Sequence, residues 1–217
     1  MKTITEKIKQ RILRKRKLYN LTTLKSFWNI DEIVSRIQKI NSEVYIDKLS
    51  EKERKYGFIT NLIEDEELKT LVDTNSNLFL SICDSVTNDI EAYILALDPD
   101  VKYNNINSQT IINLLTKYKS ENSNKNIVLY YSATKKTIRG IGLGPLLYNH
   151  LANKIIDNFA NEYERINIIV DILESPFFNA YVYNLLTKRF GFVDIEIIDE
   201  KSRKWRIVKK EIWIKTK

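Results

Sequence analysis

The sequence is sparing in several residue types that carry chemistry. Its 217 residues include one cysteine, Cys83, and one histidine, His150. The single cysteine excludes an intramolecular disulfide bond and a cysteine-based zinc site, and it weakly favours a reducing compartment. The single histidine argues against a metal site and against Ser-His-Asp catalysis, so we expect no bound metal. We expect Cys83 to be inert core and His150 to be a helix-surface or packing residue.

Long apolar runs are also missing. No run approaches the roughly 20 residues that a membrane-spanning helix needs, and the basic N-terminus lacks the apolar core of a signal peptide. We therefore expect a cytoplasmic protein with no membrane span. Hydrophobic residues make up 43% of the chain and charged residues 29%, a composition typical of one globular domain with a sizeable core.

Positive charge is concentrated at the two ends of the chain. Residues 1–20 hold eight lysines and arginines and one glutamate, and residues 201–217 repeat that balance. The middle of the chain is therefore acidic, although the formal net charge is +7. A basic end can bind nucleic acid or an acidic membrane surface, or it can remain a solvated arm.

The basic N-terminal segment carries isoleucines at helical spacing. Ile4, Ile8 and Ile12 predict an amphipathic helix over residues 3–18. We predict a basic, helical N-terminal extension, residues 1–20, ahead of a single domain, residues 21–217. A solvated or packed helix is favoured over an arm that binds nucleic acid, because its apolar stripe is narrow and has no large aromatic residue.

Hydrophobic periodicity and turn residues predict a mixture of strands and helices around one sheet, an α/β (α+β) fold. The 119–126 segment is the most loop-like, and Ser175-Pro176 is typical of a helix start, with Ser as N-cap and Pro at the first helical position. Predicted strands are 18–25, 78–83, 90–97, 127–131, 166–173, 192–198 and 205–214. Predicted helices are one capped by Asn29 or Asp31, then 64–72, 106–118, 145–159 and 176–190, the last ending at Gly191.

The distribution of glycine is the most informative feature. Three of the five glycines, Gly140, Gly142 and Gly144, fall within five residues, between a predicted strand and a predicted helix. Such a loop lets backbone N–H groups and the positive helix N-terminus surround a phosphate. The spacing differs from the dinucleotide fingerprint, and the P-loop Gly-Lys-Ser/Thr is absent. The remaining alternative is a tight turn that binds nothing.

The pattern Arg139-x-x-Gly142-x-Gly144 resembles the acyl-CoA-binding signature of the GNAT N-acetyltransferase superfamily. Asn179-Ala180 in a later helix, and the Gly191-Phe192 turn that closes it, follow in the order of that family. The resemblance covers roughly residues 20–214. It implies a mixed central sheet flanked by helices, with acetyl-CoA as co-substrate and an amine as acceptor.

The resemblance also implies how the cofactor would lie, in a cleft where the middle parallel strands separate. Its pyrophosphate would bind Arg139 and the amides of residues 140–144, which include Ile141 and Leu143. Its pantetheine arm would pair with the backbone of Ser132, Ala133 and Thr134, and Asn179 would bind that arm. Pro145 has no N–H to offer, so the loop has one donor fewer.

The resemblance leaves the catalytic groups open, because Thr187 stands where many members of the family carry a tyrosine that acts as general acid. Tyr183, one helical turn earlier, is a substitute candidate, and Thr187 could hydrogen-bond the sulfur. Asp171 and Glu174, near the end of a predicted strand, are candidate general bases. An acetyltransferase is the first hypothesis. The alternatives are an acyl-CoA sensor without turnover and a nucleic-acid-associated protein. No motif in the sequence identifies the acceptor or the oligomeric state.

Overall fold

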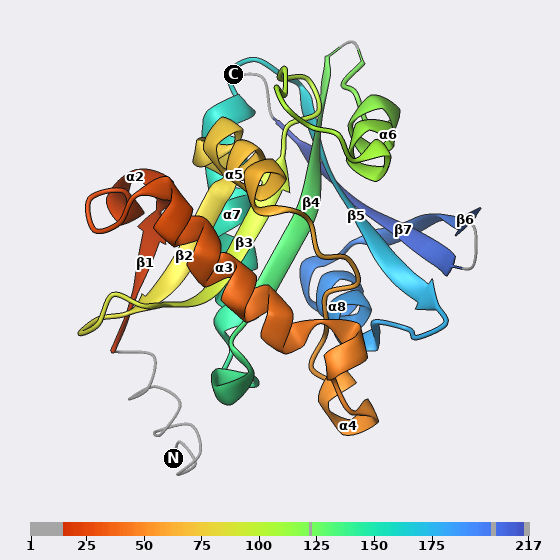
Figure 1. Ribbon diagram of the computed structural model, residues 1–217. Coiled ribbons are helices and arrows are strands. Elements are labelled where there is room, and N and C mark those ends of the chain that lie inside the picture. Colours follow the sequence, from red (N-terminus) through yellow and green to blue (C-terminus); the bar gives the residue numbers. More distant parts are fainter. Residues whose placement is uncertain (1–14, 122, 201–202, 215–217) are drawn as a thin grey trace, which may run out of the picture.

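The computed structural model describes residues 15–121, 123–200 and 203–214. A seven-stranded sheet runs through the molecule with helices on both faces (Figure 1). In chain order the elements are β1 (Arg16–Asn20), α2 (Leu21–Leu24), α3 (Ile30–Val44), α4 (Glu51–Arg54), α5 (Asp65–Thr74), β2 (Phe79–Asp84), β3 (Ile90–Leu97), α6 (Gln109–Lys117), β4 (Asn124–Thr134), α7 (Leu143–Phe159), β5 (Arg165–Ser175), α8 (Ala180–Asn184), β6 (Val193–Glu200) and β7 (Arg203–Trp213), with a π-helical turn at Leu185–Arg189.

The sheet has the strand order β1-β2-β3-β4-β5-β7-β6. Only β4 and β5 are parallel neighbours, and every other neighbouring pair is antiparallel. Helix α7 connects the two parallel strands, as a crossover between parallel strands requires. The predicted mixed sheet flanked by helices is confirmed.

Two apolar cores cover the two faces of the sheet. Helices α3 and α5 pack on one face with alternate residues of β2 and β3, including Phe79, Tyr93 and Leu95. Helix α7 packs on the other face against the intervening residues, such as Leu80 and Ile94. Side chains alternate between the two faces along a strand. Both faces of β3 are covered by helices, so its sequence is a nearly continuous hydrophobic run. Cys83 lies buried in the first core, as predicted.

Helix α3 shows how local sequence sets an element. The Asn29 side chain accepts a hydrogen bond from the Glu32 backbone amide, and the Glu32 carboxylate accepts one from the Asn29 amide, each at 2.9 Å. This reciprocal cap stabilises a helix start by about 1 kcal/mol. Ile33, Ile37 and Ile40 then recur on the buried face. Of the two predicted caps, Asn29 and Asp31, the structure has Asn29.

The structure corrects the prediction for the first residues of the sheet. Arg16–Leu18, the end of the predicted N-terminal helix, belongs to strand β1, which pairs with β2. That strand ends at Asn20, because the Asn20 side chain accepts the amide of Thr23 at 2.8 Å and starts helix α2. Residues 3–14 of the predicted helix lie outside the described residues, and the division at residue 20 stays a prediction.

A second correction concerns the segment after β5. Ser175 does not cap a helix. It is the last residue of β5 and pairs with Lys204 of β7, and the helix begins only at Ala180. Strand pairing therefore overrides the local preference of Ser175-Pro176 for a helix start. The 119–126 loop is also shorter than predicted, because β4 already begins at Asn124.

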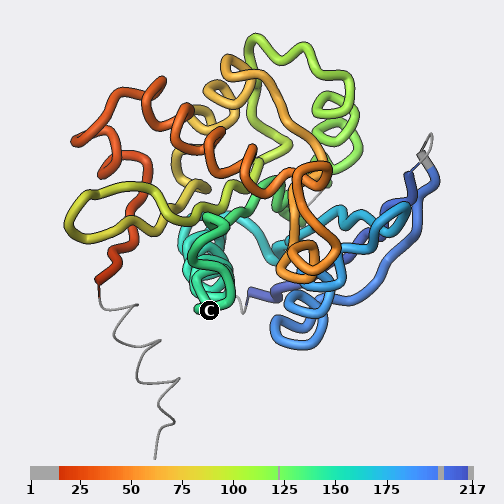
Figure 2. The backbone as a smooth tube through the Cα atoms, turned by 60° about the horizontal axis from the view of Figure 1, so that its bottom comes forward, coloured from red at the N-terminus to blue at the C-terminus, as the bar shows by residue number. Residues whose placement is uncertain are grey.

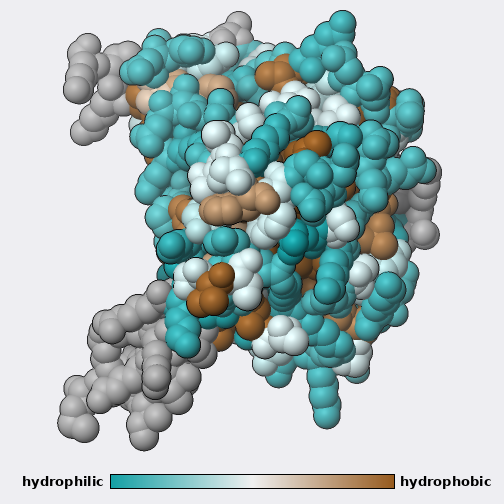
Figure 3. Space-filling view, turned by 60° about the vertical axis from the view of Figure 1, so that its left-hand side comes forward, coloured by the Kyte–Doolittle hydropathy of each residue, from teal (hydrophilic) through white to brown (hydrophobic). Residues whose placement is uncertain are grey.

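The face that includes β1, α2 and α3 is largely hydrophilic, and its hydrophobic residues are scattered rather than joined in one patch (Figure 3). Scattered apolar residues are normal on a protein surface. His150 is exposed on α7, which selects the helix surface from the two predicted alternatives. Of the helices that the structure describes, none has the length and apolar character to cross a membrane.

Candidate active site

The two parallel strands separate halfway along the sheet. Strands β4 and β5 pair from Asn124 with Arg165 to Val128 with Ile169, and within the described residues they do not pair beyond that point. Beyond it, β4 remains paired with β3 and β5 with β7. A bulge in β4 leaves Tyr130 without a partner in β3, since Leu95 pairs with Tyr131 and Ala96 with Leu129. The sheet is therefore open between its central strands, as the resemblance implied.

Three cavities lie in a row along this opening. The first, of about 60 Å³, lies at the glycine loop; the second, of about 90 Å³, lies between the separated strands; the third, of about 360 Å³, lies toward α6. Neighbouring cavities share walls. The first and second share Phe58, Ser132, Tyr148 and Val182, and the second and third share Thr60, Leu129, Tyr130, Tyr131, Asp171 and Trp205.

The glycine loop forms one wall of the first cavity. Gly140 and Gly142 have φ angles of +81° and +100°, a region that side chains other than glycine rarely adopt. Gly142 is the N-cap of the 17-residue helix α7, and a Cβ atom at Gly142 would meet no atom within 4 Å. Open space thus lies beside the positive end of a long helix, where an anion is stabilised. Leu143 and Gly144 also line this cavity.

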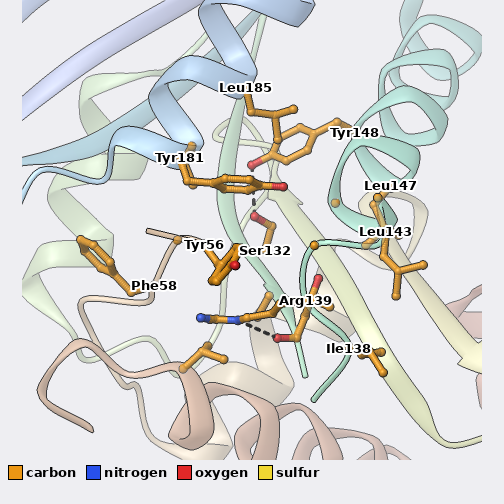
Figure 4. A pocket seen from close by; sticks show the side chains of 18 of the residues that line it. Tyr56, Phe58, Ser132, Ile138, Arg139, Leu143, Leu147, Tyr148, Tyr181 and Leu185 are labelled. Carbon is orange, nitrogen blue, oxygen red and sulfur yellow. Dashed lines mark hydrogen bonds between the residues drawn. The ribbon is translucent and has the colours of Figure 1, made fainter. Parts of the chain in front are cut away.

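Arg139 adds positive charge to the same wall (Figure 4). Among the described residues, its guanidinium makes two long hydrogen bonds to backbone carbonyls, 3.4 Å to Thr134 and 3.5 Å to Glu53. Burial lowers the pKa of Arg139, and an arginine nevertheless stays protonated at neutral pH. Lys55 and Arg189, with Ile141, line a shallow hollow beside the loop. The mouth of the first cavity is therefore cationic.

Asn179 lies at the second cavity with an unsatisfied polar atom. The residue is 7% exposed; its side-chain NH₂ group donates to the Phe58 carbonyl at 3.2 Å, and its Oδ1 atom is buried with no hydrogen-bond partner among the described residues. A buried acceptor left unpaired costs about 1–3 kcal/mol. A ligand N–H group in the second cavity would satisfy it.

The remaining predicted cofactor residues lie in β4. Ser132, Ala133 and Thr134 all line the first cavity. The Ser132 and Tyr148 hydroxyls share a hydrogen bond of 3.1 Å between their oxygens (Figure 4). Tyr148 belongs to α7 and reaches both the first and the second cavity. Burial raises the pKa of Tyr148 to about 12, so this phenol is protonated at neutral pH.

Three of the predicted catalytic residues lie away from the cavity walls. The Tyr183 hydroxyl donates to Asp194 at 3.1 Å, and the Thr187 hydroxyl donates to the Tyr183 carbonyl at 2.8 Å. Glu174 accepts two hydrogen bonds from Arg206, at 2.6 and 2.9 Å, which hold the pKa of its carboxyl below the ordinary value. None of the three lines any of the three cavities.

Asp171, the other predicted base, does lie in the opening. It lines both the second and the third cavity, and its carboxylate accepts a hydrogen bond from the Tyr118 hydroxyl at 3.0 Å. Burial and the neighbouring Asp171 carboxylate raise the pKa of Tyr118, so the phenol remains a donor. Asp171 is thus held at the wall that the two cavities share.

Sequence reasoning did not identify Gly57, Tyr148 or Tyr181 as site residues. Figures 1 and 2 show the segment after α4 beside α8. Gly57 makes this approach possible, because its φ is +86° and an added Cβ would lie 3.3 Å from Tyr181 and 3.6 Å from Asn179 Oδ1. Tyr181, not Tyr183, faces the first cavity. Gly57 carried a sequence signal, since it is one of only five glycines in the chain, and the two tyrosines carried none.

Comparisons with known proteins bear on the fold. No family model matches the sequence, and no curated protein matches it. A chain of the NatC complex, solved bound to Gag peptide and CoA, superposes with a TM-score of 0.58 at 10% identity, covering 90% of this chain and 97% of that one. The mosquito arylalkylamine N-acetyltransferase-like 5b gives 0.54 at 14% identity, covering 91% and 100%. An N-acetyltransferase from Staphylococcus aureus Mu50 gives 0.52 at 11% identity, covering 92% and 99%. The chain has the fold of the GNAT N-acetyltransferases.

Proposed function

We propose that this protein is an acetyl-CoA-dependent N-acetyltransferase that moves the acetyl group to an amine by direct attack. The observation that carries the proposal is the row of cavities, which leads from an anion-binding glycine loop, through the open sheet, to a wall with a carboxylate. The fold supports it, since the similar solved structures include N-acetyltransferases and one complex that contains CoA.

The residues along the row of cavities match the successive parts of acetyl-CoA, from its pyrophosphate to its thioester. The pyrophosphate binds the amides around Gly142 and the Arg139 guanidinium, beside the cationic mouth. The pantetheine arm follows the open side of β4 at Ser132–Thr134. Asn179 Oδ1 accepts one of its amide N–H groups, which relieves the unpaired buried oxygen. When bound, acetyl-CoA supplies an activated acyl group as its thioester.

The chemistry then takes place between the separated strands. The amine nitrogen forms a bond with the thioester carbon, and the carbon–sulfur bond breaks. Asp171 takes the proton that the amine must lose, directly or through water. Backbone N–H groups at the β4 bulge around Tyr130 polarise the thioester oxygen. The departing thiolate receives a proton from an acid on the opposite wall.

We assign that acid to Tyr148, because its protonated hydroxyl lies at the junction of the first and second cavities. Tyr183 and Thr187 are poor candidates, since their hydroxyls are engaged away from the cavities. Glu174 is a poor base, since Arg206 holds it in a bidentate ion pair. Removal of the Tyr183 hydroxyl is therefore a matched control for removal of the Tyr148 hydroxyl.

Two measurements test the proposal. Acetyl-CoA and free CoA should raise the melting temperature and NAD should not; at about 100 times the dissociation constant the rise is roughly 5–10 °C. Thiol release should then require an amine. Tyr148→Phe should lower kcat by roughly 10²-fold or more, while Tyr183→Phe should leave it unchanged. A loss of kcat in Tyr183→Phe with an unchanged kcat in Tyr148→Phe would identify Tyr183 as the acid instead.

A second candidate function is an acyl-CoA sensor without turnover. The position of Thr187 favours it, because its hydroxyl donates to a backbone carbonyl instead of facing the cavities. A rise in melting temperature with acetyl-CoA, together with no thiol release for any amine, would support the sensor and contradict the enzyme. No rise at saturating acetyl-CoA would contradict both.

A further inference from the structure

The third cavity, which we call the acceptor cavity, has a largely apolar wall. Side chains from α6, β4, β6 and β7 form it: Leu114, Val128, Leu129, Tyr130, Ile198 and Trp205. Its volume of about 360 Å³ falls in the range of roughly 300–1,000 Å³ that is usual for small-ligand sites. An apolar body is therefore the complementary occupant.

Charge in the acceptor cavity is confined to two of the described lining residues, Asp171 and Lys117. Lys117 forms an ion pair with Glu196 at 2.7 Å on the outer rim. Asp171 lies at the inner end, on the wall shared with the opening between the strands. A substrate with one ammonium group matches this arrangement. A second ammonium group would be placed against an apolar wall, where a charge without a partner is costly.

The rim of the acceptor cavity is held together by side chains from distant segments. The Asn61 side-chain oxygen accepts a hydrogen bond of 2.8 Å from the Arg203 guanidinium of β7. The Asn61 backbone carbonyl accepts one of 2.6 Å from the Tyr131 hydroxyl. The Lys117–Glu196 pair joins α6 to β6 on the other side. The β6–β7 hairpin is thus fastened to the segment around Asn61 and to α6, which favours an enclosed small molecule over a polypeptide in an open groove.

We propose that the acceptor is a small primary amine with a single positive charge on an aliphatic or aromatic body. This inference rests on the proposed acetyltransferase function. The body occupies the acceptor cavity, and the amine lies at Asp171, which is placed to direct the nitrogen toward the opening between β4 and β5. Polyamines, amino sugars and peptide N-termini are poorer acceptors.

A matched pair of amines tests the charge argument. Thiol release is measured at saturating acetyl-CoA with hexylamine and with 1,6-diaminohexane, which share a six-carbon chain and differ by the second ammonium. We expect hexylamine to have the higher kcat/KM by about 100-fold. From propylamine to hexylamine, kcat/KM should rise roughly fourfold per CH₂ group, the usual effect of burying a methylene. Equal rates for the pair, or no rise along the series, would overturn the inference.

A variant pair tests the location. Asn113 lies exposed on α6 at the mouth of the acceptor cavity, and Thr116 is exposed on the same helix away from it. Asn113→Trp should raise KM for hexylamine about tenfold or more and leave KM for acetyl-CoA unchanged, while Thr116→Trp should change neither. Thr110→Trp, also at the mouth, repeats the test if Asn113→Trp does not fold. Unchanged amine kinetics in a folded mouth variant would contradict the location.

Two controls separate the failure of this inference from that of the proposed function. A peptide with a leucine N-terminus is assayed beside hexylamine; a clear preference for the peptide would overturn the small-molecule acceptor while the acetyltransferase stands. Calorimetry with acetyl-CoA alone tests the function itself. Absence of acetyl-CoA binding would overturn the function and the inference together.

Discussion

Gly142→Ala separates the cost to the fold from the cost to ligand binding. Gly142 has a φ of +100°, and an added Cβ would meet no protein atom within 4 Å. An alanine side chain therefore fits at this position without a clash, and backbone strain is the remaining cost to the stability of the fold. Because the empty space beside Gly142 is the proposed phosphate site, the same Cβ would obstruct the ligand.

Gly191 supplies a matched control for the strain. Its φ is +70°, an added Cβ would likewise meet nothing within 4 Å, and it lines none of the three cavities. Alanine in the left-handed region costs about 1–2 kcal/mol. At roughly 2–4 °C per kcal/mol for a chain of this size, both variants should melt about 2–8 °C below the wild type without ligand.

Ligand should then distinguish the two variants. At a concentration of acetyl-CoA about 100 times the wild-type dissociation constant, binding stabilises the wild type by roughly 2.7 kcal/mol. A tenfold loss of affinity reduces that figure to about 1.4 kcal/mol. Calorimetric melting curves should therefore show the full rise for Gly191→Ala and at most about half of it for Gly142→Ala. Equal rises in the two variants would refute the assignment of the glycine loop to the cofactor.

Three further predictions concern single side chains. Asn179→Leu should weaken acetyl-CoA binding, measured by calorimetry, about tenfold or roughly 1.4 kcal/mol, because it removes the unpaired oxygen that is proposed to bind the ligand. An unchanged affinity would show that this oxygen does not contact the ligand. Lys125→Met should cost about 3–5 kcal/mol in urea unfolding at neutral pH, because buried Lys125 pairs with Asp98 and Asp100 at 2.7 Å each; a loss under about 1 kcal/mol would contradict this reasoning. In the wild type, burial tends to raise the pKa of Asp100, but hydrogen bonds from Lys125 and Ser120 outweigh it and leave the pKa lowered. The stability from Asp100 is thus present above its unfolded pKa of about 3.9 and is lost as pH falls through the folded value. The urea concentration at the midpoint should therefore decrease as the pH of the wild type falls below about 4, and the decrease should be smaller in Lys125→Met.

Most helices and strands could be located from the sequence because their signals are local. The Asn29 cap, the apolar run before Asp98 and the loop before α7 each depend on residues adjacent in the chain. Prediction failed where a distant partner decided the outcome. Ser175 stays extended because Lys204 of β7 pairs with it, and a partner 29 residues away leaves no trace in the local sequence.

Tyr183 was predicted as the acid because it precedes Thr187 by one helical turn, a spacing that assumes a regular α-helix. Successive residues of a helix are rotated by about 100°, so Tyr181 and Tyr183 point in different directions, and Tyr181 is the one that faces the first cavity. The π-helical turn at Leu185–Arg189 adds a further rotation before Thr187. Spacing counted back from Gly191 therefore could not give the direction of either side chain.

The two halves of the candidate site differ in how much the sequence discloses. The proposed cofactor half uses backbone amides in one short loop, and the only residue that allows such a backbone, glycine, marks that loop in the sequence. The acceptor half joins side chains from the segment around Asn61, α6, β4 and the β6–β7 hairpin. None of these residues has a conformational requirement of its own, so only their assembly in space defines the cavity. Substrate choice can consequently change by single substitutions on its walls, such as that at Asn113, while the glycine loop and the fold remain unaltered.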